Sequence, residues 1–223
     1  MATDYLKQSY YFFRSNLMNL ASIQLPFIVG LMLIQQSLIG EVDEVTNLQD
    51  GLFLLTAIDL LFVPIYLGAT IFYMQSIVDS AQISPLQAWA LGLKNWGRLF
   101  FTFVLSAFAI SMGLMLLVLP GLYIAVRLGL ANQVCLLEKR SPLESIKMSW
   151  GGTADLFWVL AKGLAIIYGL LFFGELALAP MVENAAIIGF ILSVALDFCN
   201  VFGVIFSFRV YRAWRDKEPV RED

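Results

Sequence analysis

The sequence contains no histidine, and charged residues make up only 14% of its 223 residues. Without histidine the chain cannot form histidine metal sites or Ser-His catalytic triads. It also lacks the side chain most often used for acid–base catalysis near neutral pH. Soluble domains carry roughly a quarter charged residues, so this composition excludes an ordinary soluble globule. The mean hydropathy of +0.79 leads to the same conclusion.

Cysteine is scarce as well. The two cysteines, Cys135 and Cys199, both lie inside apolar runs and are interpreted as packing residues, so they report little about the redox compartment. The net charge of −3 is small and indicates no particular partner. We expect no cofactor, no metal and no nucleic acid partner.

Long apolar runs dominate what remains, and six of them approach the length of about 20 residues that a helix needs to cross a bilayer. They lack the alternation of barrel strands, so they are predicted to be helices. The predicted fold class is therefore all-α, a polytopic bundle of six transmembrane helices. Residues 1–215 should form one transmembrane domain, with 216–223 as a short charged tail. The six runs are Leu17–Ile39, Leu52–Val78, Leu99–Leu119, Leu122–Leu137, Leu156–Ala179 and Ala186–Val210.

The third and fourth runs are separated only by Pro120-Gly121. A Pro-Gly pair without a polar spacer predicts a tight helical hairpin that turns at this point. The first run is too long for the apolar part of a signal peptide, which covers about 7–15 residues, so we expect it to be retained as a span.

The distribution of basic residues predicts the orientation. The connections after the first, third and fifth runs contain no lysine or arginine, whereas thirteen of the fourteen basic residues fall on the other side. The positive-inside rule therefore predicts that both termini are cytoplasmic. The acidic residues of the opposite side are Glu41, Asp43, Glu44, Asp50 and Glu183.

A short segment occurs twice, first in "ISPLQAWALGLKNWGRLFF" and 57 residues later in "RSPLESIKMSWGGTADLFWVL". In both copies a serine suits the N-cap, a proline suits the first helical position, and Gln87 or Glu144 completes a capping box. Each copy is predicted to form a short amphipathic helix in the membrane interface, with its tryptophan at the level of the headgroups. The defining residues are Ser84, Pro85 and Trp89, and Ser141, Pro142, Glu144 and Trp150.

A weaker third copy lies at the N-terminus, where Leu6, Tyr10, Phe13 and Leu17 share one helical face. The expected plan is thus three units, each an interfacial helix followed by a two-helix hairpin. These short helices serve either to anchor the hairpins, which is the simpler interpretation, or to bind a partner or sense lipid.

Lys162, Glu175 and Arg209 lie toward the ends of their predicted spans, whereas three charges lie deeper: Asp59, Arg127 and Asp197. Charges at membrane depth face the interior of a bundle, because each costs about 2.5–3.5 kcal/mol when it faces lipid. Asp59 and Arg127 have matching predicted depths, which favours pairing between them, although Arg127 can reach Asp197 instead. Tyr123 shares a helical stripe with Arg127, and Asn200 shares one with Asp197.

These residues have two interpretations. One is a structural ion pair that holds the second, fourth and sixth helices together. The other is a polar site for a lipid headgroup, a proton or an amphiphilic solute.

Three further segments, "YFFRSNLMNL", "LVLPGLYIAVRLGLANQVCLLEKRSPLESIKMSW" and "FSFRVYRAW", resemble the YciC-type family of bacterial inner-membrane proteins. The Pro-Gly hairpin followed by Ser-Pro-Leu-Glu is also similar to the membrane domain of some glycerophosphodiester phosphodiesterases. The resemblance implies six helices in an inner membrane. It implies no catalytic residues, and the hydrolase domain of those phosphodiesterases is absent from this sequence.

The leading functional expectation is a non-enzymatic inner-membrane protein concerned with envelope or membrane-lipid homeostasis. Its expected partners are membrane lipids and other inner-membrane proteins. The alternative is a small transporter or lipid-translocating protein that uses Arg127 with Asp59 or Asp197. A membrane enzyme acting on lipid is disfavoured, because the sequence has no histidine, no Gly-rich phosphate loop and no metal-ligand spacing.

Overall fold

The structure is a computed structural model that describes residues 2–40, 48–184 and 186–217. This part of the chain is helical, with no strand. The helices are α1 (Ala2–Ser15), α2 (Leu17–Gly40), α3 (Leu48–Val78), α4 (Pro85–Lys94), α5 (Trp96–Leu116), α6 (Val118–Arg127), α7 (Ala131–Leu137), α8 (Pro142–Gly152), α9 (Phe157–Asn184), α10 (Ala186–Cys199) and α11 (Val201–Arg215).

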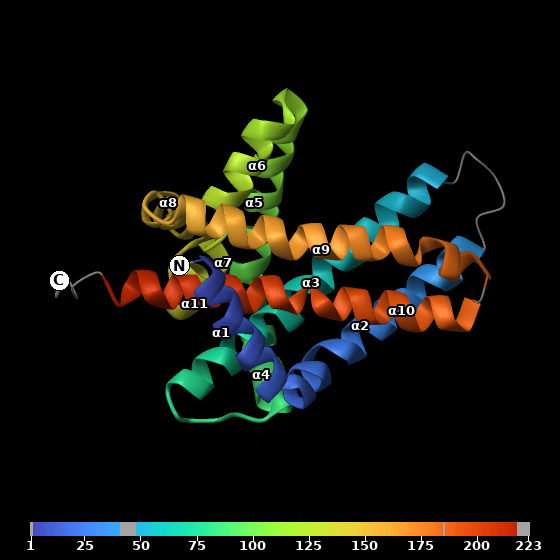
Figure 1. The fold of residues 1–223 in the computed structure, drawn as a ribbon, viewed down its shortest axis with the longest axis horizontal. Coiled ribbons are helices and arrows are strands. Elements are labelled where there is room, and N and C mark those ends of the chain that lie inside the picture. Colours follow the sequence, from blue (N-terminus) through green and yellow to red (C-terminus); the bar gives the residue numbers. More distant parts are fainter. Residues whose placement is uncertain (1, 41–47, 185, 218–223) are drawn as a thin grey trace.

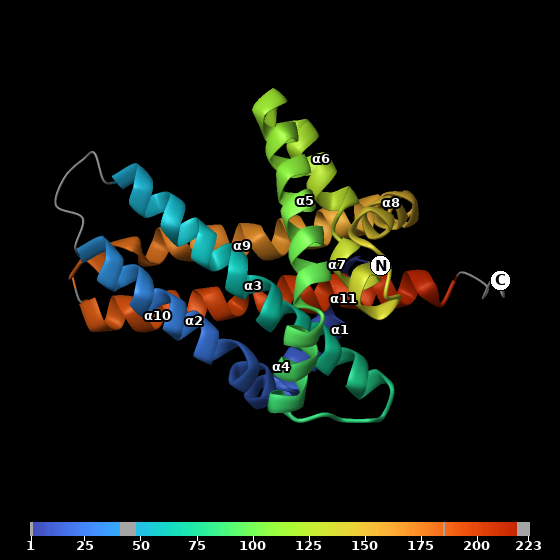
Figure 2. The ribbon, with the colours of Figure 1, turned by 180° about the vertical axis from the view of Figure 1, so that it is seen from behind.

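The long helices form three antiparallel pairs, and a short helix precedes each pair. The order is α1 before α2 and α3, α4 before α5 and α6, and α8 before α9 and α10–α11. In Figure 1 the α5–α6 hairpin stands away from the other two pairs, whose tips lie at the end of the molecule opposite to both termini. The view from behind in Figure 2 shows the same separation. The three pairs therefore diverge from a common centre.

Six helical stretches of the described residues are long and apolar enough to cross a membrane, as the sequence predicts. Two of them contain a break that the sequence analysis did not predict. The fourth run divides into α6 and α7 around Leu128–Leu130, and the sixth divides into α10 and α11 at Asn200. Both breaks bring polar residues to the centre where the three pairs meet.

The predicted turn at Pro120-Gly121 is displaced by three residues. The chain turns at Leu117, which has an extended backbone, and Pro120 and Gly121 lie within α6. Proline is tolerated there because N–H groups in the first turn of a helix lack intrahelical acceptors. Gly121 allows the close approach of α5, since a Cβ at this position would lie 2.8 Å from the backbone nitrogen of Leu114. The prediction of a tight hairpin is confirmed, whereas its turning point is wrong.

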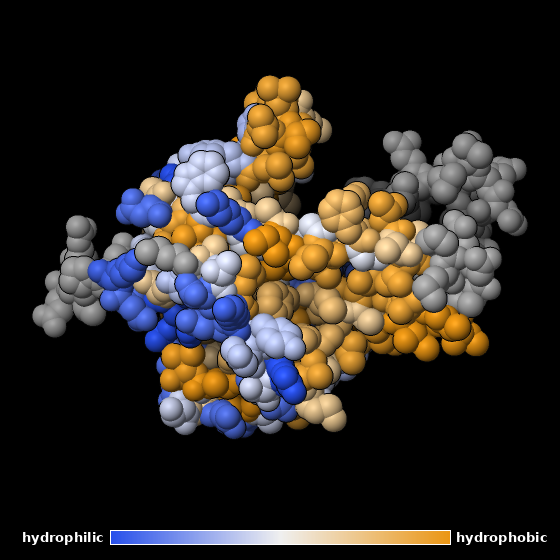
Figure 3. Space-filling view, in the orientation of Figure 1, coloured by the Kyte–Doolittle hydropathy of each residue, from blue (hydrophilic) through white to orange (hydrophobic). Residues whose placement is uncertain are grey.

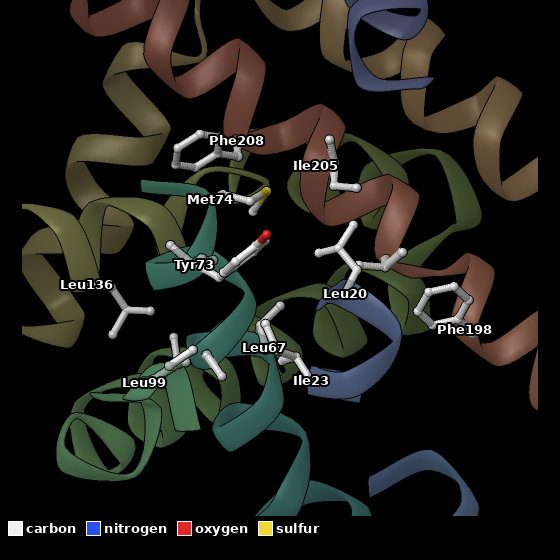
Figure 4. Close-up of a cluster of buried hydrophobic side chains, with 14 of the residues drawn as sticks. Leu20, Ile23, Leu67, Tyr73, Met74, Leu99, Leu136, Phe198, Ile205 and Phe208 are labelled. Carbon is white, nitrogen blue, oxygen red and sulfur yellow. The ribbon is translucent and has the colours of Figure 1, made fainter. Parts of the chain in front are cut away.

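The main hydrophobic core lies between α2, α3, α4 and α10–α11 and includes Leu99 of α5 and Leu136 of α7. Figure 4 shows its largest side chains converging from these helices, with Tyr73 and Met74 of α3 between α2 and α11. The Tyr73 hydroxyl donates a hydrogen bond to Asn16 and accepts one from Asn19. A second cluster joins α7, α9 and α11 through Val134, Leu160 and Phe206.

The surface divides into a hydrophilic and a hydrophobic region (Figure 3). Hydrophilic residues gather at the end with the termini, and hydrophobic residues cover the hairpins. At the tip of α5–α6, Met115 is 87% exposed and Leu119 is 78% exposed, as expected for side chains that contact lipid.

Some predictions fall on parts of the chain that the structure does not describe. Glu41, Asp43 and Glu44 lie outside the described residues, as do the side chains of Asp50 and Glu183 and most of the predicted tail, residues 218–223.

Candidate functional site

A cavity of about 520 Å³ occupies the centre where the three helix pairs diverge. Helices α2, α3, α7, α9 and α11 contribute more than one residue each to its wall, and α5, α6 and α10 contribute one residue each. From Gln24 to Gln35 it extends along three turns of α2, a distance of about 16 Å. The polar residues of the wall are Gln24, Gln35, Asp59, Tyr66, Asn132, Gln133, Tyr168, Asp197, Asn200 and Ser207.

Asp59 of α3 faces α2 across the cavity. Both of its carboxylate oxygens accept hydrogen bonds of 3.1 Å from the amide nitrogen of Gln35. Deeper in the same helix pair, the Gln24 amide donates to the Thr70 hydroxyl, which in turn donates to the carbonyl of Tyr66. These bonds orient two amides and one carboxylate toward the space between the pairs.

Asp197 and Asn200 enter the wall because the last transmembrane segment is broken between α10 and α11. The Asn200 N–H bonds to the carbonyl of Asp197, and the Gly203 N–H bonds to the carbonyl of Asn200. Gly203 leaves room for Tyr168, whose hydroxyl lies 2.7 Å from the position that a Cβ would take. The break and the glycine together give the polar side chains access to the cavity.

The side-chain amides of α7 provide oxygen acceptors for which the described residues offer no hydrogen-bond donor. Asn132 Oδ1 and Gln133 Oε1 are buried and have no hydrogen-bond partner among the residues that the structure describes, and Gln133 as a whole is buried. Native structures rarely leave such atoms unpaired, so an unpaired pair on a cavity wall indicates a site for a hydrogen-bond donor. No lysine or arginine is present among the lining residues. The cavity wall therefore carries two acidic side chains without a basic one and is rich in hydrogen-bond acceptors.

Arg127 is not part of this cavity, and the expected pair with Asp59 or Asp197 is wrong. Among the described residues no salt bridge joins Arg127 to either aspartate. Its guanidinium instead lies over the rings of Tyr123, at 5.8 Å from the ring centroid, and Trp150, at 5.0 Å. Equal depth would imply pairing only in one straight helix from residue 122 to residue 137, whereas α6 ends at Arg127 and belongs to the divergent hairpin.

Helix α8 stabilises the break that follows Arg127. The Ser149 hydroxyl donates to the carbonyl of Arg127 (2.9 Å) and accepts from the N–H of Leu130 (3.2 Å). The Thr153 hydroxyl donates to the same carbonyl at 3.1 Å. Backbone groups freed by the break are thereby paired with side chains more than 18 residues away.

The structure brings together three of the five predicted intramembrane residues in the cavity, namely Asp59, Asp197 and Asn200. The other two, Tyr123 and Arg127, lie together at the base of α6 beside Trp150.

Both predicted capping boxes are formed. Ser84 accepts from the N–H of Gln87, Ser141 accepts from that of Glu144, and each third residue accepts from the backbone N–H of its serine, with Pro85 and Pro142 in the first turn. The hydrogen bond from the Ser141 N–H lowers the pKa of the Glu144 carboxyl below its ordinary value. The interfacial position of the two helices stays a prediction.

Sequence reasoning missed the amides and tyrosines of the wall. Gln24, Gln35, Asn132 and Gln133 interrupt apolar runs in the same way as the aspartates do, and this interruption is the signal that could have identified them. Gln24 and Gln35 are eleven residues apart, close to three full turns, which places them on one face of α2.

The fold and its cavity define the chain as a polytopic helical membrane protein. It is similar to a UPF0259 membrane protein of Pectobacterium carotovorum subsp. carotovorum, with 28% identity over 157 residues, 66% of this chain and 60% of the relative. A UPF0259 membrane protein of Photorhabdus laumondii subsp. laumondii is 26% identical over 155 residues, 65% of this chain and 57% of the relative. These matches confirm the resemblance to the YciC-type family.

The matches extend over no more than 60% of the length of these relatives. The resemblance to the membrane domain of glycerophosphodiester phosphodiesterases stays an expectation. No family model matches the chain, and no solved structure does.

Proposed function

We propose that this protein binds an ammonium-bearing ligand in its central cavity, and that this binding serves membrane-lipid homeostasis without a catalysed reaction. The ligand is the headgroup of an aminophospholipid or a free amine, since both present the same group. The observation that carries the proposal is the composition of the wall: two carboxylates, two unpaired buried amide oxygens and no basic side chain among the lining residues.

The energetics of the membrane support a cationic ligand. A carboxylate at the centre of a membrane helix costs about 2.5–3.5 kcal/mol on insertion scales, and such groups face cavities or partners. Neither Asp59 nor Asp197 forms a salt bridge within the described part of the chain, and the hydrogen bonds to Asp59 come from the neutral amide of Gln35, which supplies no compensating charge. An ammonium group offsets this charge and donates three hydrogen bonds.

The divergence of the helix pairs supports access from the bilayer. Asp197 and Asn200 lie on the exposed side of the wall, between α9–α10 and α2–α3, whereas Gln133 is at the closed side. A headgroup that enters between the pairs meets Asp197 first. This route also favours the alternative of a lipid-translocating protein, now with Asp59 and Asp197 as its polar residues and without Arg127.

We further propose the bacterial inner membrane as the location, with both termini in the cytoplasm. The support is the positive-inside pattern of the sequence together with the hydrophilic region around the termini. Membrane lipids are the proposed partners.

Native mass spectrometry of the purified protein tests the proposal. The protein is incubated with phosphatidylethanolamine or with phosphatidylglycerol, which lacks the ammonium group, and free ethanolamine is added in a third arm. The wild type should retain phosphatidylethanolamine preferentially. Asp59→Asn and Asp197→Asn should each lower this preference about tenfold, the usual effect of losing a hydrogen bond to a charged group.

Asp79→Asn is the matched control, because Asp79 bonds to Gln75 on the exposed end of α3 and does not line the cavity. Equal retention of the two lipids, together with no effect of ethanolamine, contradicts the proposal. Competition by ethanolamine at the concentration that binds the lipid identifies a free amine as the ligand.

A further inference from the structure

Arg127, Tyr123 and Trp150 form a second polar feature, at the base of the α5–α6 hairpin and apart from the cavity. We propose that this feature is a binding site for the phosphate of a membrane phospholipid, with Arg127 as the anion-binding group. The site is independent of the cavity and of the ligand proposed there.

The pairing of Arg127 is incomplete. Its side chain is buried, with 8% of the residue exposed, and its Nε has no hydrogen-bond partner among the described residues. The guanidinium interacts with the two aromatic rings. A guanidinium carries five N–H donors. The face of an aromatic ring attracts the positive charge but does not provide the oxygen acceptors that a carboxylate provides. A buried cation with free donors is therefore left for an anion.

The side chain of Arg127 is not needed to cap its own helix. The carbonyl of Arg127 at the end of α6 already accepts hydrogen bonds from the hydroxyls of Ser149 and Thr153. Arginine near a helix C-terminus often stabilises the last carbonyls. Here that role is filled, and the guanidinium is directed at Trp150 instead.

The surroundings fit a lipid better than a soluble anion. Tyr123 and Trp150 are both partly exposed, and aromatic side chains of this kind are enriched at the depth of the headgroups. Beyond them the surface of α6 continues as the exposed leucines Leu119 and Leu122, along which an acyl chain can lie. A phospholipid whose phosphate binds Arg127 would thus place its acyl chain along the surface of α6.

The rings are held before any ligand binds. Tyr123 packs edge-on against Trp150, with 5.8 Å between the ring centroids, and lies 5.1 Å from the ring of Phe157 at the start of α9. Three helices therefore fix the position of the guanidinium. Arginine suits this role because its planar fork binds two phosphate oxygens at once.

The test measures lipid binding to the purified protein by native mass spectrometry in three arms: phosphatidylglycerol, diacylglycerol with the same acyl chains, and inorganic phosphate. We expect retention of phosphatidylglycerol and not of the other two. Arg127→Gln should weaken retention at least about tenfold, and Arg127→Lys should give an intermediate loss, because a point charge replaces a bidentate fork. Arg98→Gln, which removes an arginine bonded to Asn95, is the matched control and should have no effect.

Equal retention by the wild type and a folded Arg127→Gln protein overturns the proposal. Binding of inorganic phosphate at the affinity of the lipid overturns it too, in favour of a soluble anion. If Arg127→Gln does not fold, the proposed site is tested by fluorescence quenching in proteins that retain Arg127. Brominated phosphatidylglycerol should quench the Trp150 emission, taken as wild type minus Trp150→Phe, more than brominated diacylglycerol does, and equal quenching refutes the site.

Discussion

Helices α4 and α8 begin with the same type of capping box, and equivalent positions of the two helices also have the same degree of burial. From Ser84 to Leu93 and from Ser141 to Trp150, residues 57 apart are buried, half-buried or exposed in the same order. The two helices nevertheless contact different parts of the protein: α4 packs on α2 and α3, and α8 contacts the break between α6 and α7. One difference lies at a buried position, which is Gly92 in α4 and Ser149 in α8.

Gly92 brings two backbones together. A Cβ at Gly92 would lie 2.5 Å from the carbonyl oxygen of Ile65 and 3.0 Å from the nitrogen of Ala69, both in α3. One turn earlier, the Trp89 indole donates to the carbonyl of Ile23 in α2. Helix α4 is thus fixed to the first helix pair, and its tryptophan faces protein rather than the headgroup layer alone.

Ser149 has a hydroxyl group at the position where α4 has Gly92. It joins Arg127 to Leu130 across the break between α6 and α7, and the next residue, Trp150, covers the Arg127 guanidinium. One amphipathic repeat therefore serves packing in one copy and a polar site in the other. The capping sequence favours a helix, and the residues that follow it determine what each helix contacts.

The largest effect should come from giving α8 the residue of α4. Ser149→Gly leaves the buried N–H of Leu130 without its acceptor, which costs about 1–3 kcal/mol, and adds the helix penalty of glycine, about 1 kcal/mol. We expect the free energy of unfolding in detergent to fall by the sum. Ser149→Ala, measured beside it, should show the hydrogen-bond part alone. A loss as small as that of an exposed serine would mean that the break does not depend on α8.

The reciprocal change, Gly92→Ser, should destabilise the protein somewhat less. The new side chain meets the backbone of α3, which cannot move aside as a flexible side chain would, and overpacking of this kind costs about 1–3 kcal/mol. Gly151→Ala is the control in α8: nothing lies within 4 Å of its added Cβ, so it should be neutral or stabilising in thermal unfolding. Similar losses at both glycines would refute the close contact of α4 with α3.

The contrast between the two helices also explains how far the sequence could predict this molecule. The capping boxes, the helical pairs and the six spans follow from local patterns, and the structure confirms them. The break after Arg127 does not follow from local pattern, because the groups that stabilise it, Ser149 and Thr153, come from another helix. A sequence read segment by segment therefore predicts one straight helix there.

The sequence predicted the residues of the candidate site only in part, because the contacts between different helices do not follow from local patterns. Charged residues in apolar runs identify Asp59 and Asp197 as interior groups, but depth along separate helices says nothing about lateral distance. Arg127 has the same predicted depth as Asp59 but lies in a hairpin that diverges from α3. The i, i+4 spacing of Tyr123 and Arg127 was the better guide, because neighbours on one helix stay together wherever the helix goes.

The N-caps should show where the two helices are alike. Ser84→Ala and Ser141→Ala each remove one side-chain acceptor from the first turn, and each should lower the free energy of unfolding by about 1 kcal/mol. Equal losses in chemical denaturation support equivalent roles for the two capping boxes. Losses that differ severalfold would show that one cap carries tertiary contacts which the other lacks.

The smallest effect should appear on acidification, because the two capping boxes differ in one titratable group. Glu144 closes the box of α8, whereas Gln87 closes that of α4 and does not ionise. The hydrogen bond from the Ser141 N–H favours the ionised carboxylate, so the pKa of Glu144 in the folded state lies below the ordinary value of 4.5. Its contribution to stability is therefore complete above that value and is lost as the pH falls through the lowered pKa.

The difference in unfolding free energy between the wild type and Glu144→Gln isolates this contribution from the other carboxylates. It should be constant at neutral pH and shrink below pH 4.5, the ordinary value. Gln87→Glu should transfer the same acid sensitivity to α4, since the Ser84 N–H is already placed to donate to residue 87. A difference between wild type and Glu144→Gln that is independent of pH would show that the hydrogen bond does not favour the charged form.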